Sequence, residues 1–137
     1  MSLPVSDLQQ IIPGDSNQLF LFFGSRSEVW RFHTTHFQAE RIEMRPGRHV
    51  PARNNQRLWR SQRGDLYWII WKYGLLKYNP ATRSFTDDNS FRLPAGWISD
   101  VGIFEDTLKK QIWFPCPDSG LAVHDLKSGQ TWTPRNN

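Results

Sequence analysis

The sequence predicts an all-β fold: a single domain over residues 1–137 with three blade-like repeats of about 46 residues, each a four-stranded antiparallel sheet. Glu28, Gly74 and Gly120 are spaced 46 residues apart, and an apolar residue follows each of them. Seven Trp and nine Phe occur in a chain with only 38% hydrophobic residues, so polar turns separate large aromatic side chains. Short apolar runs between turn residues are typical of strands.

The first repeat covers approximately residues 8–44. Turn-forming residues interrupt its apolar runs, above all Pro13, Gly14 and Asp15. The predicted strands of this repeat are 9–12, 19–23, 28–32 and 37–44. The last of them alternates only loosely between apolar and polar residues, which predicts a strand at the edge of its sheet.

The second repeat covers approximately residues 57–89 and follows an Arg-rich connection at 45–56. Pro and Gly residues in this connection exclude a helix interior or a central strand. The most apolar run of the chain is 66–70, LYWII, which predicts a buried strand. The predicted strands of this repeat are 58–61, 66–70, 75–78 and 82–86.

The third repeat covers approximately residues 97–133 and has a charged turn at 105–110. The predicted strands of this repeat are 98–104, 111–114, 120–125 and 130–133. The apolar runs 19–23, 65–69 and 111–115 have the same phase relative to the 46-residue spacing. We therefore expect Trp68 and Trp113 to be buried where neighbouring repeats pack together.

Two parts of the repeat carry a recognisable motif. The run 74–82, GLLKYNPAT, and the tetrad 22–25, FFGS, show it most clearly. The third repeat matches again at Trp113, Gly120, Leu121, Asp125, Ser128 and Gly129. These residues resemble the two-component regulator propeller family. The repeat of that family pairs a strand ending in a WIGT-like tetrad with a downstream pattern of Gly, hydrophobic, aromatic, Asx-Pro and Thr-Gly.

This resemblance implies a non-catalytic ligand-sensing or protein-interaction module from the periplasmic sensor part of a two-component signal-transduction protein, with carbohydrate as a candidate ligand. Without the resemblance, the expected location is cytoplasmic. Three repeats are too few to close a propeller, which needs four to eight blades. We therefore expect a homo-oligomer or a part of a longer propeller.

In a propeller, the breaks between the second and third strands of the blades line up on one face. The residues expected to converge there are Arg26, Trp71, Tyr73, Asp118 and Ser119. Aromatic faces combined with Arg and Asp hydrogen-bonding groups suit a sugar. This set is the candidate ligand-binding site, although the family motif itself designates no ligand-binding residue.

The alternative function is a small basic binding protein that contacts nucleic acid or another acidic partner. Seven arginines and one acidic residue lie between Arg41 and Arg63, in a chain of net charge +4. The candidate anion-binding residues are Arg45, Arg48, Arg53, Arg57, Arg60 and Arg63. Guanidinium groups suit phosphate oxygens, but they also serve as solvated charges that keep a sheet edge from pairing with other chains.

The remaining candidate chemistry is sparse. His33 and His36 have no further metal ligand at suitable spacing, so no metal site is predicted. Cys116 and His124 could form a thiol and imidazole pair, but a buried structural cysteine is the favoured interpretation. Because no catalytic carboxylate pair or phosphate-binding loop stands out, we expect no enzyme and no cofactor. The sequence has neither a visible secretory leader nor an apolar segment of 18 residues, so we expect no membrane insertion in this segment.

Overall fold

The computed structural model describes residues 7–50, 56–91, 93, 102–116 and 120–133. These residues form twelve strands and one short 3-10 helix, η1 (Gly24–Arg26). The first unit contains β1 (Leu8–Pro13), β2 (Gln18–Phe23), β3 (Glu28–His33) and β4 (Gln38–Arg45). The second unit contains β5 (Gln56–Arg60), β6 (Leu66–Ile70), β7 (Gly74–Asn79) and β8 (Ser84–Asp88). The third unit contains β9 (Phe104–Asp106), β10 (Gln111–Cys116), β11 (Gly120–Asp125) and β12 (Thr131–Trp132).

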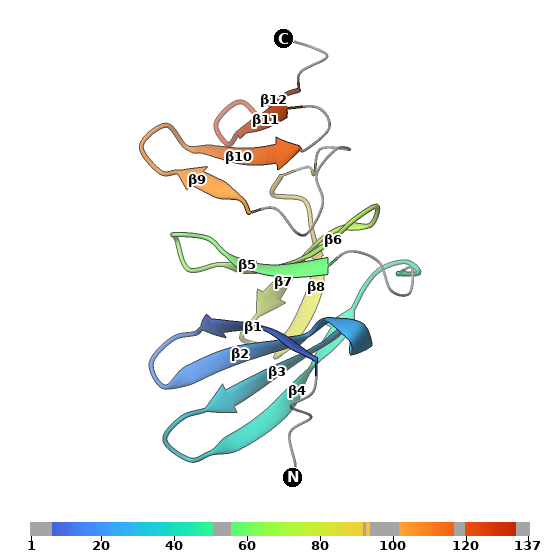
Figure 1. The fold of residues 1–137 in the computed structure, drawn as a ribbon, viewed down its shortest axis with the longest axis vertical. Helices are drawn as coiled ribbons and strands as arrows, with labels where there is room; N and C mark the ends of the chain where they lie inside the picture. The colour runs from blue at the N-terminus through green and yellow to red at the C-terminus, as the bar shows by residue number, and fades with distance from the viewer. Residues whose placement is uncertain (1–6, 51–55, 92, 94–101, 117–119, 134–137) are drawn as a thin grey trace.

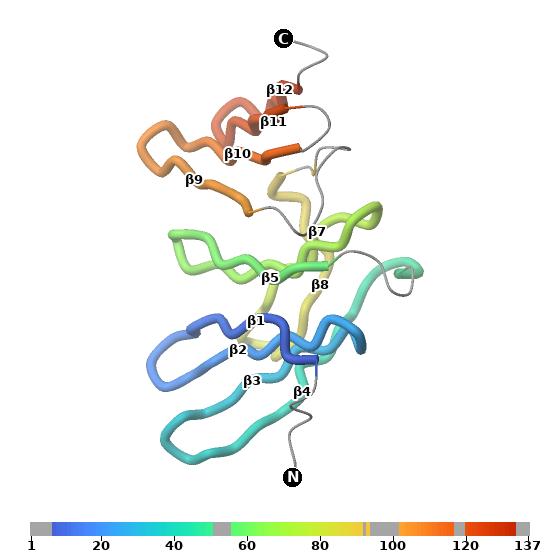
Figure 2. Tube along the Cα trace, viewed as in Figure 1, coloured from blue at the N-terminus to red at the C-terminus, as the bar shows by residue number. Residues whose placement is uncertain are grey.

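The three units follow one another along the longest axis of the molecule (Figure 1). Each unit is an antiparallel sheet in which every strand pairs with the next one in the sequence. The turns between β1 and β2, β5 and β6, and β9 and β10 lie on the same side of this stack (Figure 2). The all-β expectation with four strands in each repeat therefore agrees with the observed topology.

The expectation of three separate sheets is wrong for the first two units. β4 pairs in parallel with β8, so these units form one eight-stranded sheet with the order β1-β2-β3-β4-β8-β7-β6-β5. The two edge strands of this sheet, β1 and β5, are also joined. Leu58 of β5 donates its backbone N–H to Gln10 Oε1 of β1 at 2.8 Å. The Gln10 amide donates back to the Leu58 carbonyl oxygen at 3.0 Å. The sheet is thus nearly closed, like a barrel, and β4 is not an edge strand.

The repeat of 46 residues is visible in the backbone. Phe37, Arg83 and Gly129, spaced 46 residues apart, all have positive φ, at 53°, 52° and 75°. In the first and third units, this residue donates its N–H to the carbonyl oxygen four positions earlier. The third and fourth strands of each unit are therefore joined by equivalent turns.

β2 is displaced by one residue from the predicted phase. Phe22 pairs with Val29, whereas the equivalent of Val29, Leu75, pairs with Ile69. The offset between the second strands is thus 47 residues, because η1 makes the following turn one residue longer. Ser27 ends this turn with a left-handed φ of 52°, which explains why Glu28 can replace the glycine of the other repeats.

β6 lies at the centre of the molecule and uses both of its faces. Leu66, Trp68 and Ile70 pack in a cluster with residues of the first unit. Tyr67 and Ile69 pack in a second cluster with residues of the third unit. Because side chains of a strand alternate between the two faces of its sheet, a fully apolar run is needed here.

Several other boundaries differ from the predicted ones. β9 begins at Phe104 and continues into the predicted charged turn, while most of the predicted strand 98–104 lies outside the described residues. Trp68 is fully buried as expected. Trp113 is only partly buried, because alternate residues of β10 face the second unit and Trp113 is directed to the opposite face.

Candidate ligand-binding site between the second and third units

A cavity of about 580 Å³ lies where the second and third units meet. The second unit contributes the beginning of β7 and the segment 87–91, and the third unit contributes His124, Leu126 and Gly129. Arg48, from the connection that follows β4, reaches the same cavity. Three segments that are distant in the sequence therefore line one space.

Phe91 provides the apolar wall of this cavity. Its ring lies 5.4 Å from the Tyr67 ring in an edge-on arrangement and 5.8 Å from the Phe114 ring. The His124 ring follows at 6.2 Å. Aromatic contacts of this geometry stabilise a fixed position, so Phe91 holds the two units together and also presents a rigid surface to the cavity.

Asp87 organises the polar rim. Its two carboxylate oxygens accept hydrogen bonds from the Tyr73 hydroxyl and from the Gly47 N–H, each at 2.8 Å. Burial, followed by the bond to Asp87, raises the pKa of Tyr73, so the phenol stays protonated as a donor. The Arg48 guanidinium lies 4.3 Å from the centre of the Tyr73 ring and donates to the Tyr73 carbonyl oxygen. These contacts hold the connection that follows β4, which contains Gly47 and Arg48, against the rim of the cavity.

Polar groups continue the rim at the partly buried Asp88 and at the exposed Asn89 and Ser90. Asp88 accepts a hydrogen bond from the Ser90 N–H at 2.9 Å, which shapes the turn after β8. The Asn89 side chain is exposed at the cavity. This part of the rim offers carboxylate, amide and hydroxyl groups to a ligand.

His124 forms the opposite wall and is buried. Its Nδ1 lies 2.8 Å from Thr131 Oγ1, so the hydroxyl fixes the orientation of the ring. Burial lowers the pKa of His124, and the nearby Asp125 carboxylate partly opposes this effect. The imidazole is therefore neutral at neutral pH.

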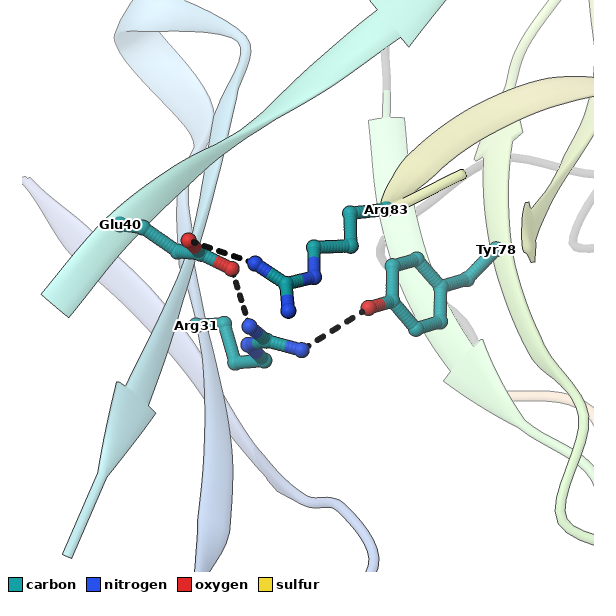
Figure 3. A network of polar contacts seen from close by, with 4 residues as sticks. All are labelled: Arg31, Glu40, Tyr78 and Arg83. Carbon is teal, nitrogen blue, oxygen red and sulfur yellow. Dashed lines mark hydrogen bonds and ion pairs between the residues drawn. The ribbon is translucent and has the colours of Figure 1, made fainter. Parts of the chain in front are cut away.

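A second cavity, of about 540 Å³, reaches from the first to the second unit. Its charged side chains already have partners: Arg60 pairs with Asp15 at 2.9 Å, and Lys77 pairs with Asp65 at 3.6 Å. Arg31 is likewise bound to Glu40 and Tyr78 (Figure 3). Asp87 and Asp88 border both cavities. The cavity between the second and third units adds the exposed Asn89 and Ser90 beside the aromatic wall at Phe91, so it is the better candidate site.

Of the predicted ligand-binding residues, Tyr73 lines the candidate cavity. Arg26 is exposed in η1 of the first unit, and Trp71 lies in the turn after β6, where the Lys72 ammonium is 4.5 Å above its ring. Neither of these two residues lines the cavity. Asp118 and Ser119 lie outside the described residues.

The candidate anion-binding arginines are distributed over several elements. Arg48 lines the cavity, whereas Arg45 on β4 pairs with Glu43 at 2.9 Å. Arg57 and Arg60 lie on β5, which three strands separate from β4 in the sheet. Arg63 is exposed in the turn after β5, and Arg53 lies outside the described residues. The described arginines therefore do not gather on one strand or turn.

Sequence reasoning did not identify Phe91 or the segment 87–90 as a site, and it considered His124 only as a partner of Cys116. A possible signal was the combination of four polar residues, DDNS, with an aromatic residue directly after them. Polar groups beside an aromatic face are typical of small-molecule sites. The contribution of His124 depends on the packing of two units and has no local signal.

The other candidate residues, Cys116, His33 and His36, make contacts within the protein. Cys116 is buried as expected, and its thiol donates to the Phe114 carbonyl oxygen at 3.5 Å. Burial raises the pKa of this thiol, which disfavours the thiolate. The His33 and His36 rings stack at 4.6 Å. Within the described ranges, no group of three metal-ligating side chains occurs.

The fold and the cavity define an all-β stack of sheets with a small-molecule-sized site between two units. No family model matches the sequence, and no curated protein matches it. Two solved structures from B. thetaiotaomicron have a similar fold. Both show the extracellular domain of the same protein, which is described in one case as a one-component system and in the other as a hybrid two-component system. The first has 14% identity to this chain and a TM-score of 0.60, and the second has 15% identity and a TM-score of 0.58.

Each comparison covers 96% of this chain but 18% of the other chain. The present chain therefore has the fold of a limited part of these extracellular domains. In the part of the chain that the structure describes, no helix has the length and apolar character needed to cross a membrane.

Proposed function

We propose that this chain is a non-catalytic sensing module that recognises a small ligand outside the cytoplasm, in the periplasm or at the cell surface. The observation that carries this proposal is the fold similarity over 96% of the chain to the extracellular domain of one protein, which is described both as a one-component and as a hybrid two-component system. The cavity between the second and third units supplies a specific place for the ligand.

We infer further that the three units are consecutive blades of a propeller-like array. Equivalent turns recur every 46 residues at Phe37, Arg83 and Gly129. Each of the two contacts between units also packs one sheet face against the face of the next unit. These features support blades, while the parallel pairing of β4 with β8 is a specialisation of the first two units.

The ligand class that suits the cavity is an oligosaccharide. Its hydroxyl groups can donate to Asp88 and accept from Asn89, and the Arg48 guanidinium can bind a further oxygen. Apolar C–H groups of a sugar ring can pack on the wall that contains Phe91. Both charge signs occur on the rim, which favours a polar ligand without a large net charge.

The proposal is tested by isothermal titration calorimetry with neutral oligosaccharides, such as cellotetraose and xylotetraose, and with tetragalacturonate. We expect one of them to bind, and we expect Asp88→Ala or Asn89→Ala to weaken binding at least tenfold. Asn17→Ala, in an exposed turn of the first unit, is the matched control. Binding that is insensitive to both cavity variants, or the absence of binding across the panel, would contradict the proposal.

A further inference from the structure

The two ends of the stack each present a sheet face with no neighbouring unit among the described residues. The first unit turns one face away from the second unit, and the third unit does the same on the opposite side. Large exposed hydrophobic residues gather on these two faces. They are Leu8, Ile11, Phe104 and Leu121, which are 38%, 57%, 61% and 51% exposed. We call these faces the first-unit outer face and the third-unit outer face.

The third-unit outer face carries a continuous apolar row. Phe104 pairs with Trp113, Trp113 pairs with Val123, and Val123 pairs with Trp132, so the row crosses all four strands. Residues paired in register lie side by side on the same face of a sheet. Leu121, two residues from Val123, extends the apolar area along β11.

The first-unit outer face has a similar row. The exposed Ile11 pairs with Leu21, which is itself buried, and Leu21 pairs with the partly buried Trp30. A neighbouring row contains Leu19 and Phe32, which also pair with each other. Contiguous apolar surface of this kind marks an interaction site on a soluble protein.

The repeat identifies what fits these faces. Leu121 is equivalent to Val29 and Leu75, both of which are buried against the following unit. Trp30 is equivalent to Leu76 and Ala122, and these residues are buried against the preceding unit. The third-unit outer face is therefore of the type that receives a following unit, and the first-unit outer face is of the type that receives a preceding unit.

The side chains at equivalent positions also support a contact between the third-unit outer face and the first-unit outer face. Between the first and second units, Arg31 and Glu40 face Tyr78 in a polar network that also includes Arg83 (Figure 3). On the third unit, the positions equivalent to Arg31 and Glu40 are Val123 and Trp132.

The position equivalent to Tyr78 on the first unit is Phe32. Inside the molecule, the polar Arg31 and Glu40 meet the Tyr78 phenol. Between the two outer faces, the apolar Val123 and Trp132 would meet the Phe32 ring at the equivalent positions. Each face thus matches the other in chemical character, in the same way that the faces inside the molecule match.

We propose that the third-unit outer face binds the first-unit outer face of a second copy of this chain, in a head-to-tail arrangement. The contact repeats the packing seen between the units inside one chain. Two copies that make this contact twice contain six units, a number within the range that closes a ring of blades.

The test is the solution mass by light scattering on a size-exclusion column over a range of protein concentrations. The 137-residue chain is expected at twice its mass of 16.1 kDa. Ile11→Lys disables the first-unit outer face, and Phe104→Lys with Leu121→Lys disables the third-unit outer face. Each variant alone is expected to be a monomer. Because each retains the face that the other lacks, a mixture of the two variants is expected to form a 1:1 dimer.

Leu108→Lys is the matched control, because Leu108 is 94% exposed in the turn after β9 and lies on neither face. It is expected to leave the mass unchanged. A monomer at every concentration would overturn the proposal. Self-association of the Ile11→Lys variant, which would indicate that two third-unit outer faces bind each other, would also overturn it. Circular dichroism of each variant verifies that loss of association is not loss of folding.

Discussion

The contacts on the two sides of the second unit are built differently, although both use the faces of β6. On the side of the first unit, the Trp68 ring is fully buried, with the Phe22 and Phe85 rings at 5.9 and 5.3 Å. On the side of the third unit, Phe91 is the central ring, and a cavity of about 580 Å³ remains beside it. A cavity of about 540 Å³ also adjoins the first contact, so the two contacts differ in their central aromatic ring rather than in the presence of free space.

The first contact also has more extensive backbone pairing than the second. The first contact includes the parallel β4 and β8 pair and the hydrogen bonds that join Gln10 to Leu58. In the second contact, the Gln62 N–H donates to Glu105 Oε1 at 2.8 Å, and no strand of the second unit pairs with one of the third in the described ranges. One repeat thus forms both a nearly closed pair of units, joined by strand pairing, and a second contact without strand pairing among the described residues.

Trp68→Ala is expected to have the largest effect on stability. It removes the ring at the centre of the first contact and leaves Gln56 Oε1 without the indole donor that lies 3.0 Å away. Loss of a buried Trp side chain costs about 4 kcal/mol of unfolding free energy. Urea denaturation measures this loss, with Trp71→Ala, at a partly buried position in the turn after β6, as the control. A loss equal to that of the control would contradict the central position of Trp68.

Phe91→Ala is expected to have the second largest effect, a loss of about 3 kcal/mol, because the adjoining cavity already limits the packing around this ring. The expected change is local: the third unit separates from the second before the first two units unfold. Urea denaturation followed by both tryptophan fluorescence and circular dichroism distinguishes these events. Coincident transitions in this variant would contradict the difference between the two contacts.

Gln10→Ala is expected to cost about 1 to 2 kcal/mol, because it leaves the Leu58 N–H and carbonyl groups without their partners. Only the first contact should respond. Faster hydrogen exchange is expected at Leu58 and along β1, with unchanged exchange in the third unit. Gln9→Ala, on an exposed neighbouring residue, is the control. Equal exchange in both variants would show that these bonds do not close the sheet.

His124 gives the second contact a pH dependence of smaller size. Burial lowers the pKa of His124 in the folded protein, so the unfolded chain binds a proton first as the pH falls through about 6.5. The unfolding free energy is therefore expected to fall below this pH, until the folded protein also becomes protonated. His124→Gln should flatten the dependence, and His49→Gln, at an exposed position, should not. An unchanged slope in His124→Gln would assign the effect to other groups.

The sequence predicted the strand pattern well because local physical rules set it. Residues 66–70 are apolar throughout, and the structure buries every one of them. The equivalent turns at Phe37, Arg83 and Gly129 follow the same 46-residue spacing as the predicted repeat. Such features depend on strand alternation and turn geometry, which a sequence displays directly.

The joining of the first two sheets and the candidate cavity could not be predicted in this way. The pairing of Met44 with Phe85 joins residues far apart in the chain, with no local pattern to indicate it. The one-residue displacement of β2 depends on η1 and on the left-handed Ser27. Tyr73 was predicted to present its aromatic face to a ligand, whereas its side chain is buried and its hydroxyl and carbonyl groups bind Asp87 and Arg48 at the rim.

Native-state hydrogen exchange at low urea concentrations tests the difference between the two contacts most directly. We expect the amides of β10 and β11 to exchange through an opening of lower free energy than the amides of β2 and β6. The third unit would then open while the first two remain closed. A single opening free energy shared by all three units would contradict this result and would show that the two contacts are equally strong.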